Sequence, residues 1–466
     1  MAKGKTLPEG AAERITARLD RLPGTRHIWK LVLLMSLGGC FEIYDLFFTA
    51  YVAPGLFKAG IFTPTTVSFF GMTGLAGFIA ALFLGLFIGT IAFSYVADRF
   101  GRRTIFIFAL LWYSIATFIL AFQDSADGMN LWRFIAGIGV GVELVTIDAY
   151  LSELVPKNIR GKAFAFQQGI GQIAVPLVAF LAWLLVPTAP FGFDGWRWVV
   201  LIGSVGAIVI WLLRLGLPES PRWLAHQGRI EEAERVMAAI EAKVQKQYGK
   251  ALPPVGPPAP ALAKPGRYIE VFSREYRKRT IMLTVFNFFQ TIGFYGFANW
   301  VPTLLIAKGI HVTQTLEYTF VIALAYPIWP LVSMLYADKM ERKWQICLSA
   351  LCIAVFGMIF ATQETAGALI AIGLLQTAAI IWLSFSFHTY QSELYPTRMR
   401  ARAVGFVYSW SRISVVLTSF MVAAVLRDFG VTGVFVFIAL AMAIVIFIIG
   451  IFGPKTNLLA LEHISR

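Results

Sequence analysis

The chain has 466 residues, of which 58% are hydrophobic and only 14% are charged, and its mean hydropathy is +0.70. A soluble core needs far less apolar sequence, so this composition indicates many membrane-spanning segments. The formal net charge of +14 does not argue for nucleic-acid binding, because the Lys and Arg residues cluster in short segments between apolar runs, where membrane topology accounts for them.

Twelve apolar runs are long enough to cross a bilayer core, which takes about 20 helical residues. They lie at about 28–52, 66–95, 104–122, 129–152, 163–187, 196–217, 280–306, 314–336, 343–361, 366–391, 402–426 and 432–453. Loops rich in positive charge alternate with loops that have little, which predicts that both terminal segments, 1–27 and 454–466, are cytoplasmic. Short termini, compact outer loops and no evident signal peptide favour a bacterial inner membrane.

One long loop, 218–279, separates two predicted halves, 28–217 and 280–453. Within it, residues 229–248 have the period of an amphipathic helix, with apolar Ile230, Ala233, Met237 and Ile240 on one face. Residues 251–265 are rich in proline and should be extended or disordered. The loop is either a connection with a surface helix or part of a gate.

Two charged segments recur at a constant offset. YVADRFGRR (95–103) is matched by LYADKMERK (335–343), and SELVPKNIRGKAFAF (152–166) by SELYPTRMRARAVGF (392–406); both pairs are 240 residues apart. Equally spaced charged segments between apolar runs indicate two related halves, an arrangement typical of transporters.

The segment SYVADRFGRR (94–103) resembles the loop 2–3 signature of the major facilitator superfamily (MFS), and PESPRW (218–223) resembles an element of its sugar-porter and organic-ion branches. The chain departs from the signature at Ser94 and, in the second copy, at Glu341, where glycine is usual. The resemblance extends over the whole chain. It implies an all-α membrane protein with twelve transmembrane helices in two pseudo-symmetric halves of six, commonly working as a monomer.

The same resemblance implies a cytoplasmic network of charges that pair in one conformational state and separate in another. Alternatively, these charges only fix the topology. The candidate gating residues are Asp98, Arg99, Arg102, Arg103, Glu153, Arg160, Glu219, Arg222, Asp338, Glu393 and Arg400. Asp148 and His388 also align at the 240-residue offset, so they could face each other as an inner gate or proton relay, or else belong to an ordinary cytoplasmic-edge pair.

The fourth span begins RFIAGIGVG (133–141), which resembles the family's arginine-and-glycine motif in that helix. Gly137 and Gly141 are one turn apart, so a neighbouring helix could approach closely there. Arg133 is expected near the outer end of the span. It either belongs to a coupling network or is an interfacial arginine that snorkels or pairs locally.

Carboxyl groups inside a span are costly and usually functional. Glu42 and Asp45 lie three residues apart in the first span, on roughly one face and near the bilayer middle. Burial there favours the protonated form, which suits reversible protonation. Asp45 is the first candidate for proton coupling and Glu42 the second, with Arg133 and Glu143 of the fourth span as further candidates. The alternative is a structural pair bonded to neighbouring helices.

Arg412 lies about halfway along the eleventh span, where a buried cation needs an anion. It either binds an anionic substrate or pairs internally with Asp45 or Glu42. Neutral polar and aromatic residues of nearby spans complete a candidate substrate site: Gln168, Gln172, Asn287, Gln290, Tyr295 and Trp382.

The predicted function is proton-coupled symport of a small organic anion, an aromatic or heterocyclic carboxylate, by alternating access. A sugar or polyol symporter is the alternative, and a non-transporting sensor is a third reading. An enzyme is not expected, because the sequence has no GxxxxGK[ST] segment, metal-ligand cluster or nucleophile triad, and its three cysteines lie in apolar runs. The expected partners are the substrate, protons and lipid, with no cofactor, metal or nucleic acid.

Overall fold

The structure is a computed structural model that describes residues 11–63, 66, 74–256, 268–333, 340–395 and 399–456. The side chains of residues 92–99, 145, 268–269, 333 and 400–401 lie outside this description. The helices are α1 (Ala11–Asp20), α2 (Arg26–Lys58), α3 (Gly74–Phe100), α4 (Arg102–Leu120), α5 (Ala126–Leu154), α6 (Arg160–Leu185), α7 (Gly195–Arg214), α8 (Pro221–His226), α9 (Ile230–Tyr248), α10 (Arg277–Ala298), α11 (Val301–Ala307), α12 (Val312–Ala323), α13 (Ala325–Ser333), α14 (Arg342–Thr362), α15 (Ala366–Glu393) and α16 (Arg400–Phe452).

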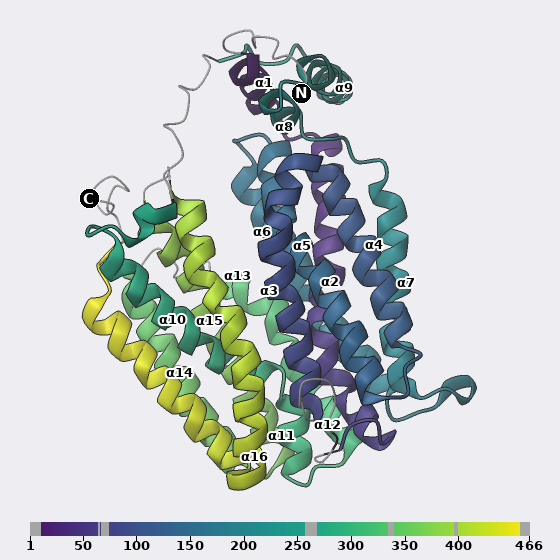
Figure 1. The fold of residues 1–466 in the computed structure, drawn as a ribbon, viewed down its shortest axis with the longest axis vertical. Coiled ribbons are helices and arrows are strands. Elements are labelled where there is room, and N and C mark those ends of the chain that lie inside the picture. The colour runs from purple at the N-terminus through teal and green to yellow at the C-terminus, as the bar shows by residue number, and fades with distance from the viewer. Residues whose placement is uncertain are drawn as a thin grey trace.

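Eleven segments of the described chain are long and apolar enough to cross a membrane. The last of them, in the 53-residue α16, contains a break at Gly430, whose φ of 66° and ψ of −165° are accessible to glycine because it has no Cβ. The helix therefore supplies two spans. The prediction of twelve transmembrane helices in two halves is confirmed, with α2–α7 in the N-terminal half and α10–α16 in the C-terminal half (Figure 1).

The two halves meet along α3 and α16, α6 and α12, and α2 and α11. We call the end of the bundle that holds α1, α8 and α9 the linker end, and the opposite one the far end (Figure 1). Aromatic contacts join the halves toward the far end, including Phe47 with Tyr326 at 5.4 Å between ring centroids and Trp183 with Phe320 at 5.7 Å. Toward the linker end the helices of the two halves diverge (Figure 1).

Glycines bring α3 and α5 into backbone contact. A Cβ atom on Gly137 would lie 2.3 Å from the carbonyl oxygen of Leu82, and one on Gly141 would lie 2.4 Å from that of Leu86. Contacts this short exclude any side chain, so the predicted close approach of a neighbouring helix is confirmed. The contact also fixes the position of Arg133, one turn before Gly137.

The linker end carries a separate small core. Helix α9 occupies the segment expected to be amphipathic, and it packs with α1 and α8 through buried Ile15, Leu19, Ala233, Met237, Ile240 and Val244. Ion pairs reinforce the contact between α1 and α9, because Arg18 pairs with Glu234 and Glu241, and Arg21 also pairs with Glu241 at 2.7 Å. The first helix of the chain is therefore docked on the linker.

Candidate substrate and proton site

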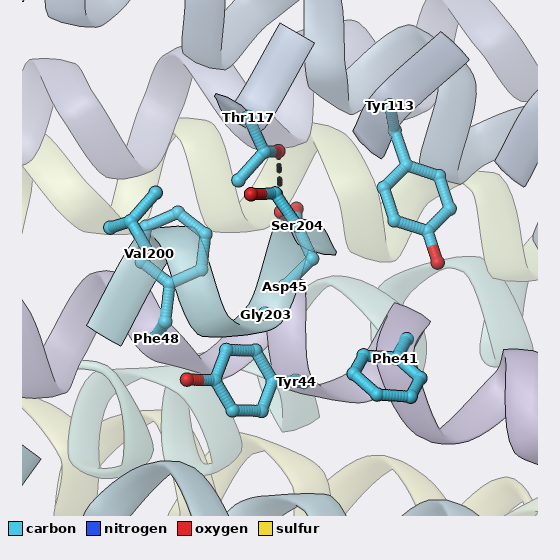
Figure 2. A pocket seen from close by; sticks show the side chains of 9 residues that line it. All are labelled: Phe41, Tyr44, Asp45, Phe48, Tyr113, Thr117, Val200, Gly203 and Ser204. Atoms are coloured by element: carbon cyan, nitrogen blue, oxygen red, sulfur yellow. Dashed lines mark hydrogen bonds between the residues drawn. The ribbon is translucent and has the colours of Figure 1, made fainter. Parts of the chain in front are cut away.

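Asp45 of α2 and Arg133 of α5 form a buried ion pair. The Nη1 atom of Arg133 donates to Asp45 Oδ2 at 2.8 Å, and its Nη2 atom donates to the Asp45 carbonyl at 2.5 Å and to Thr49 Oγ1 at 2.6 Å. The second carboxylate oxygen of Asp45 accepts from Thr117 Oγ1 at 2.8 Å (Figure 2). Arg133 is 0% exposed, so it pairs locally and does not snorkel.

The surroundings of Asp45 belong entirely to the N-terminal half. Figure 2 shows the small pocket that it lines, together with Phe41, Tyr44, Phe48, Tyr113, Thr117, Val200, Gly203 and Ser204. The guanidinium of Arg133 also lies over the ring of Phe48, 4.2 Å from its centroid. Protonation of Asp45 would leave this arginine without its anion in a poorly hydrated site.

A second buried pair joins Glu143 of α5 to Arg214 of α7, and both side chains are fully buried. Arg214 Nη1 donates to Glu143 Oε1 at 2.7 Å, and Nη2 donates to the carbonyl of Met35 on α2 at 3.1 Å. Its guanidinium lies 3.7 Å from the centroid of the Phe106 ring. A Cβ atom on Gly38 would lie 1.2 Å from Arg214 Nη2, so a glycine at that position makes room for the cation.

Glu42 lies among these groups without an ion pair. It is 3% exposed, and within the described residues no Lys, Arg or His nitrogen lies within 4.0 Å of its carboxylate. The charged groups that act on it from neighbouring helices are Glu143, Asp148, Arg214 and Arg412. Three buried carboxyls thus share two buried arginines in the N-terminal half, and Glu42 is the carboxyl that remains unpaired.

Arg412 of α16 is the one buried arginine among the described residues of the C-terminal half, with 9% of its surface exposed. Its Nη1 atom lies 3.5 Å from the hydroxyl of Tyr295, and its guanidinium lies 5.0 Å from the centroid of the Tyr408 ring. No carboxylate of the described chain lies within ion-pair distance of it. Arg133 and Arg214, the other two buried arginines, each have a carboxylate partner.

Aromatic rings extend from Arg412 in two directions. The Tyr295 ring contacts Phe83 of the N-terminal half at 4.8 Å, and the Tyr408 ring contacts His388 at 5.3 Å. His388 in turn stacks on Phe387 at 4.1 Å. The cation therefore sits among flat apolar surfaces that could hold an aromatic ring.

Asp148 and His388 are both exposed to solvent although they lie on helices of the bundle interior. Asp148 acts electrostatically on Glu42, and Arg412 acts on His388. No hydrogen bond joins Asp148 to His388 among the described residues, and His388 Nδ1 instead contacts the Ser384 carbonyl at 2.7 Å, so their pairing stays a prediction.

The predicted polar residues of the substrate site divide into two groups. Gln168 is exposed, and Gln172 and Asn287 each have a buried amide oxygen with no hydrogen-bond donor in the described chain. By contrast, Gln290 donates to Thr291 at 3.1 Å. Trp382 donates its indole N–H to Gln345 of α14 at 3.4 Å. The first group retains capacity for a ligand, whereas Gln290 and Trp382 are engaged with their own half.

Three predicted gating residues, together with Arg342, which was not among them, form matching ion pairs within each half. Arg102 pairs with Glu153 at 3.2 Å, and Arg342 pairs with Glu393 at 2.8 Å. These residues are equivalent under the 240-residue offset, so the repeat in the sequence corresponds to a repeat in side-chain pairing. The side chains of Asp98, Arg99 and Arg400, and the whole of Asp338, lie outside the described residues.

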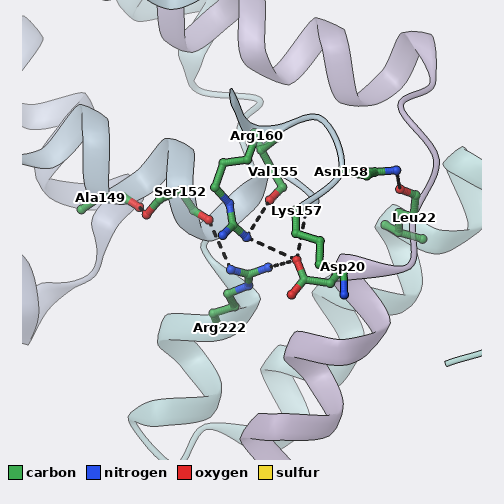
Figure 3. A network of polar contacts seen from close by, with 9 residues as sticks. All are labelled: Asp20, Leu22, Ala149, Ser152, Val155, Lys157, Asn158, Arg160 and Arg222. Carbon is green, nitrogen blue, oxygen red and sulfur yellow. Dashed lines mark hydrogen bonds and ion pairs between the residues drawn. The ribbon is translucent and has the colours of Figure 1, made fainter. Parts of the chain in front are cut away.

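Arg160 and Arg222 both bind Asp20, an acidic residue that the sequence analysis did not select. Asp20, the last residue of α1, accepts from Arg222 Nη2 at 2.6 Å and from Arg160 Nη2 at 3.3 Å (Figure 3). Its Oδ1 atom also accepts from the backbone N–H of Lys157 at 3.0 Å. The N-terminal segment therefore supplies the anion for two of the predicted gating arginines.

Glu219, which follows α7, contacts the junction between α3 and α4. It accepts from the backbone N–H of Arg103 at 3.0 Å, and a Cβ atom on Gly101, whose φ is 103°, would lie 2.5 Å from its Oε2 atom. Burial raises the pKa of Glu219 above its ordinary value, although the N–H groups of Arg103 and Ser220 oppose the rise. Arg103 also donates to the carbonyl of Leu215 at 2.7 Å, which ties α4 to the end of α7.

The structure adds residues that sequence reasoning missed: Asp20, Thr117, Arg214 and Tyr408. Arg214 had a usable signal, because it is a charged residue inside a predicted span, as Arg412 is. Thr117 and Tyr408 gave none, since neutral polar and aromatic residues are common in membrane helices. Asp20 lay in a terminal segment with no predicted contacts.

Comparisons with known proteins identify the family and the fold. The family described as sugar (and other) transporter matches residues 31–466. The putative metabolite transport protein YyaJ of Bacillus subtilis is 30% identical over 94% of this chain and 95% of its own length, and the niacin transporter NiaP of Acinetobacter baylyi is 27% identical over 97% and 99%. The inward-open xylose transporter XylE from E. coli is 20% identical, covers 94% of this chain and 99% of that chain, and superposes with a TM-score of 0.73.

Proposed function

Since the chain belongs to the sugar (and other) transporter family of the major facilitator superfamily, we propose that it is a proton-coupled symporter of a small organic anion. The observation that carries the proposal is Arg412, a buried cation for which the described chain supplies no carboxylate. A desolvated charge without a counter-ion is costly, so a site of this kind is suited to receive an anion from solution. The substrate carboxylate would occupy that position.

The surroundings of Arg412 favour a flat substrate. The rings of Tyr295, Tyr408 and Phe83 offer apolar faces beside the guanidinium, and such rings bind other rings by edge-to-face or offset contacts. The relative from Acinetobacter baylyi is named a niacin transporter, and niacin is a pyridine carboxylate. We therefore propose an aromatic or heterocyclic carboxylate, with the amide oxygens of Gln172 and Asn287 as acceptors for its polar substituents.

Proton coupling is proposed for the N-terminal half. Glu42 can gain or lose a proton without breaking an ion pair, whereas protonation of Asp45 would separate it from Arg133. Glu42 is therefore the proposed site of proton uptake and release. Because Glu42 and Arg412 act on each other, neutralising Glu42 by protonation would leave Arg412 freer to bind the substrate anion. Proton and anion binding would then favour each other.

Transport would proceed by alternating access, in which the two halves rock about the site between them. The halves diverge at the linker end in Figure 1, and we propose that this end faces the cytoplasm of a bacterium, with the protein in the inner membrane. Exposure of Asp148 and His388 supports an opening on that side. The proposed transport path lies between the two halves of one chain, so we propose that the protein works as a monomer.

The test is uptake by the purified protein in liposomes with an imposed inward proton gradient. We expect accumulation of an aromatic carboxylate such as nicotinate or benzoate that is abolished by a protonophore. A preliminary screen by thermal shift, with carboxylates, sugars and organic cations, would choose the substrate, because a bound ligand raises the melting temperature. Accumulation of a sugar and no carboxylate would overturn the anion assignment and favour the sugar alternative.

A further inference from the structure

A basic groove lies at the linker end of the N-terminal half, away from the substrate site. It is bounded by the first turns of α2, the end of α7 and helix α9, which crosses this end of the half (Figure 1). Its main lobe has a volume of about 500 Å³, and a second lobe of about 260 Å³ shares His27, Leu31, Gly216 and Lys243 with it. These volumes are in the range of about 300–1,000 Å³ that is typical of small-molecule sites.

The charged residues that line the groove are cationic or titrate to a cation. The main lobe has Arg26, His27, Lys30 and Lys243, and the second lobe adds Arg235. No aspartate or glutamate is among the described residues that line either lobe. The lining is thus a concentrated positive site, complementary to an anion.

The acids of α9 do not neutralise this face. Of the four acids of α9, Glu234 and Glu241 point to α1, where they pair with Arg18, and Glu232 pairs with Arg229 at the start of the helix. The fourth, Glu231, lies one turn before Arg235 but is not among the described residues that line either lobe. Within the described chain, neither Lys30 nor Lys243 lies within 4.0 Å of a carboxylate. The docking of α1 therefore divides α9 into a neutralised face and a face with uncompensated positive charge.

Below the charged lining, the groove continues into a lipid-facing surface. Leu34 and Leu213 line the groove itself, and Leu213 is 51% exposed. On the same side of α7, Val205 and Val209 are 48% and 50% exposed at intervals of one turn. An apolar strip thus leads from the cations along a helix that spans the membrane.

We propose that this groove binds an anionic phospholipid, with the phosphate headgroup beside Lys30 and Lys243 and an acyl chain along the exposed strip of α7. Basic pockets between transmembrane helices at the membrane surface suit anionic headgroups, and a soluble anion would not need the apolar strip. Because the lipid would contact α2, α7 and α9 together, it would hold the linker against the N-terminal half. The proposal is independent of the transported substrate.

The test is a titration of the purified full-length protein in detergent with dioleoylphosphatidylglycerol, followed by melting temperature. We expect a saturable rise that dioleoylphosphatidylcholine does not give. A cation near an anionic lipid contributes about fivefold to binding, so Lys30→Gln with Lys243→Gln should weaken the apparent affinity about 25-fold. Lys30→Arg with Lys243→Arg should retain it, which separates loss of charge from loss of fold.

A matched control removes the same charge from the other half. Arg274 and Lys278 are exposed and lie just before and within the start of α10, so Arg274→Gln with Lys278→Gln should leave the titration unchanged. An equal weakening in this control would overturn the proposal in favour of diffuse surface charge. A rise of the same size with inorganic phosphate alone would overturn it in favour of a soluble anion, and no difference between the two lipids would overturn it outright.

Discussion

Glu42 and Arg412 are buried charges of opposite sign in opposite halves of the molecule, and neither has an ion-pair partner among the described residues. They are 3% and 9% exposed, and each acts electrostatically on the other. In the described part of the chain the other buried charges are already matched, Asp45 with Arg133 and Glu143 with Arg214. The unmatched pair is therefore the proposed place for a proton and an anion, because neither would break an ion pair already present.

Replacing Arg412 should weaken substrate binding without loss of stability. A charge-assisted hydrogen bond contributes about 1.5–3 kcal/mol, so Arg412→Ala should weaken carboxylate binding by about 10- to 150-fold. No carboxylate of the described chain is left unpaired by the change, so the melting temperature without substrate should not fall. Arg427→Ala, at an exposed site on the same helix, is the control. An unchanged affinity in Arg412→Ala would remove the arginine from the substrate site.

Replacing Glu42 should uncouple transport while leaving the fold intact. Glu42→Gln preserves shape and breaks no ion pair, so thermal stability should stay close to that of the native protein. Accumulation driven by a pH gradient should be lost, while exchange of labelled substrate across the membrane should persist. If Glu42→Gln still accumulates substrate in response to the gradient, the coupling carboxyl lies elsewhere.

Replacing Asp45 should have a different effect, because it leaves Arg133 buried and unpaired. Removing one member of a buried pair costs about 3–5 kcal/mol, so Asp45→Asn should lower the melting temperature markedly. The double variant Asp45→Asn with Arg133→Gln should recover part of this loss, since no charge is then left unmatched. Equal stability of the single and the double variant would show that the pair is not maintained in the folded protein.

Gly38 should not tolerate a methyl group. A Cβ atom there would overlap Arg214 Nη2 at 1.2 Å, so Gly38→Ala should displace the guanidinium from Glu143 and destabilise the protein by several kcal/mol. Gly405→Ala is the matched control, because nothing lies within 4 Å of its Cβ position. The measurement is thermal unfolding of both variants. Equal melting temperatures would mean that Arg214 can move aside.

Docking of α1 should weaken in acid. Burial raises the pKa of Glu241, but bonds from Arg18 and Arg21 outweigh it, so the pKa lies below the ordinary value of 4.5. Glu241 therefore binds a proton less tightly when α1 is docked than when α1 is free. Docking should be at full strength above about pH 4.5 and should be lost as the pH falls through the lowered pKa.

This release can be followed by spin-label distances between cysteines placed at Arg14 and Gln245, in a background without the three native cysteines. We expect a narrow distance distribution at pH 7 that broadens below pH 4.5. Glu241→Gln should give a broad distribution at both values, because it removes the acceptor for both arginines. A narrow distribution in Glu241→Gln would show that the apolar contact alone docks α1.

The sequence predicted the positions of the helices and of many charged residues within them, but not which charged side chains form ion pairs. Spans could be located because bilayer thickness sets their length, and the offset between the repeated segments indicated two halves. Distances between helices depend on tertiary packing, so Asp45 was ranked first for proton coupling without knowledge that Arg133 pairs with it. Arg214 could have been noted as a charged residue inside a predicted span, but its pairing with Glu143 and the space that Gly38 leaves for it depend on packing.

Every buried carboxyl of the described residues lies in the N-terminal half, whereas Arg412 belongs to the C-terminal half. The proposed proton site and the arginine proposed to bind the substrate anion would then be encoded in separate parts of the gene. Mutations at Arg412 could then change the preference for an anion without altering the carboxyl groups of the first half. Chimaeras of related chains joined within the linker should take their preference for a carboxylate from the C-terminal donor, whereas the fit of the substrate ring should depend on both donors, because Phe83 and Gln172 lie in the N-terminal half.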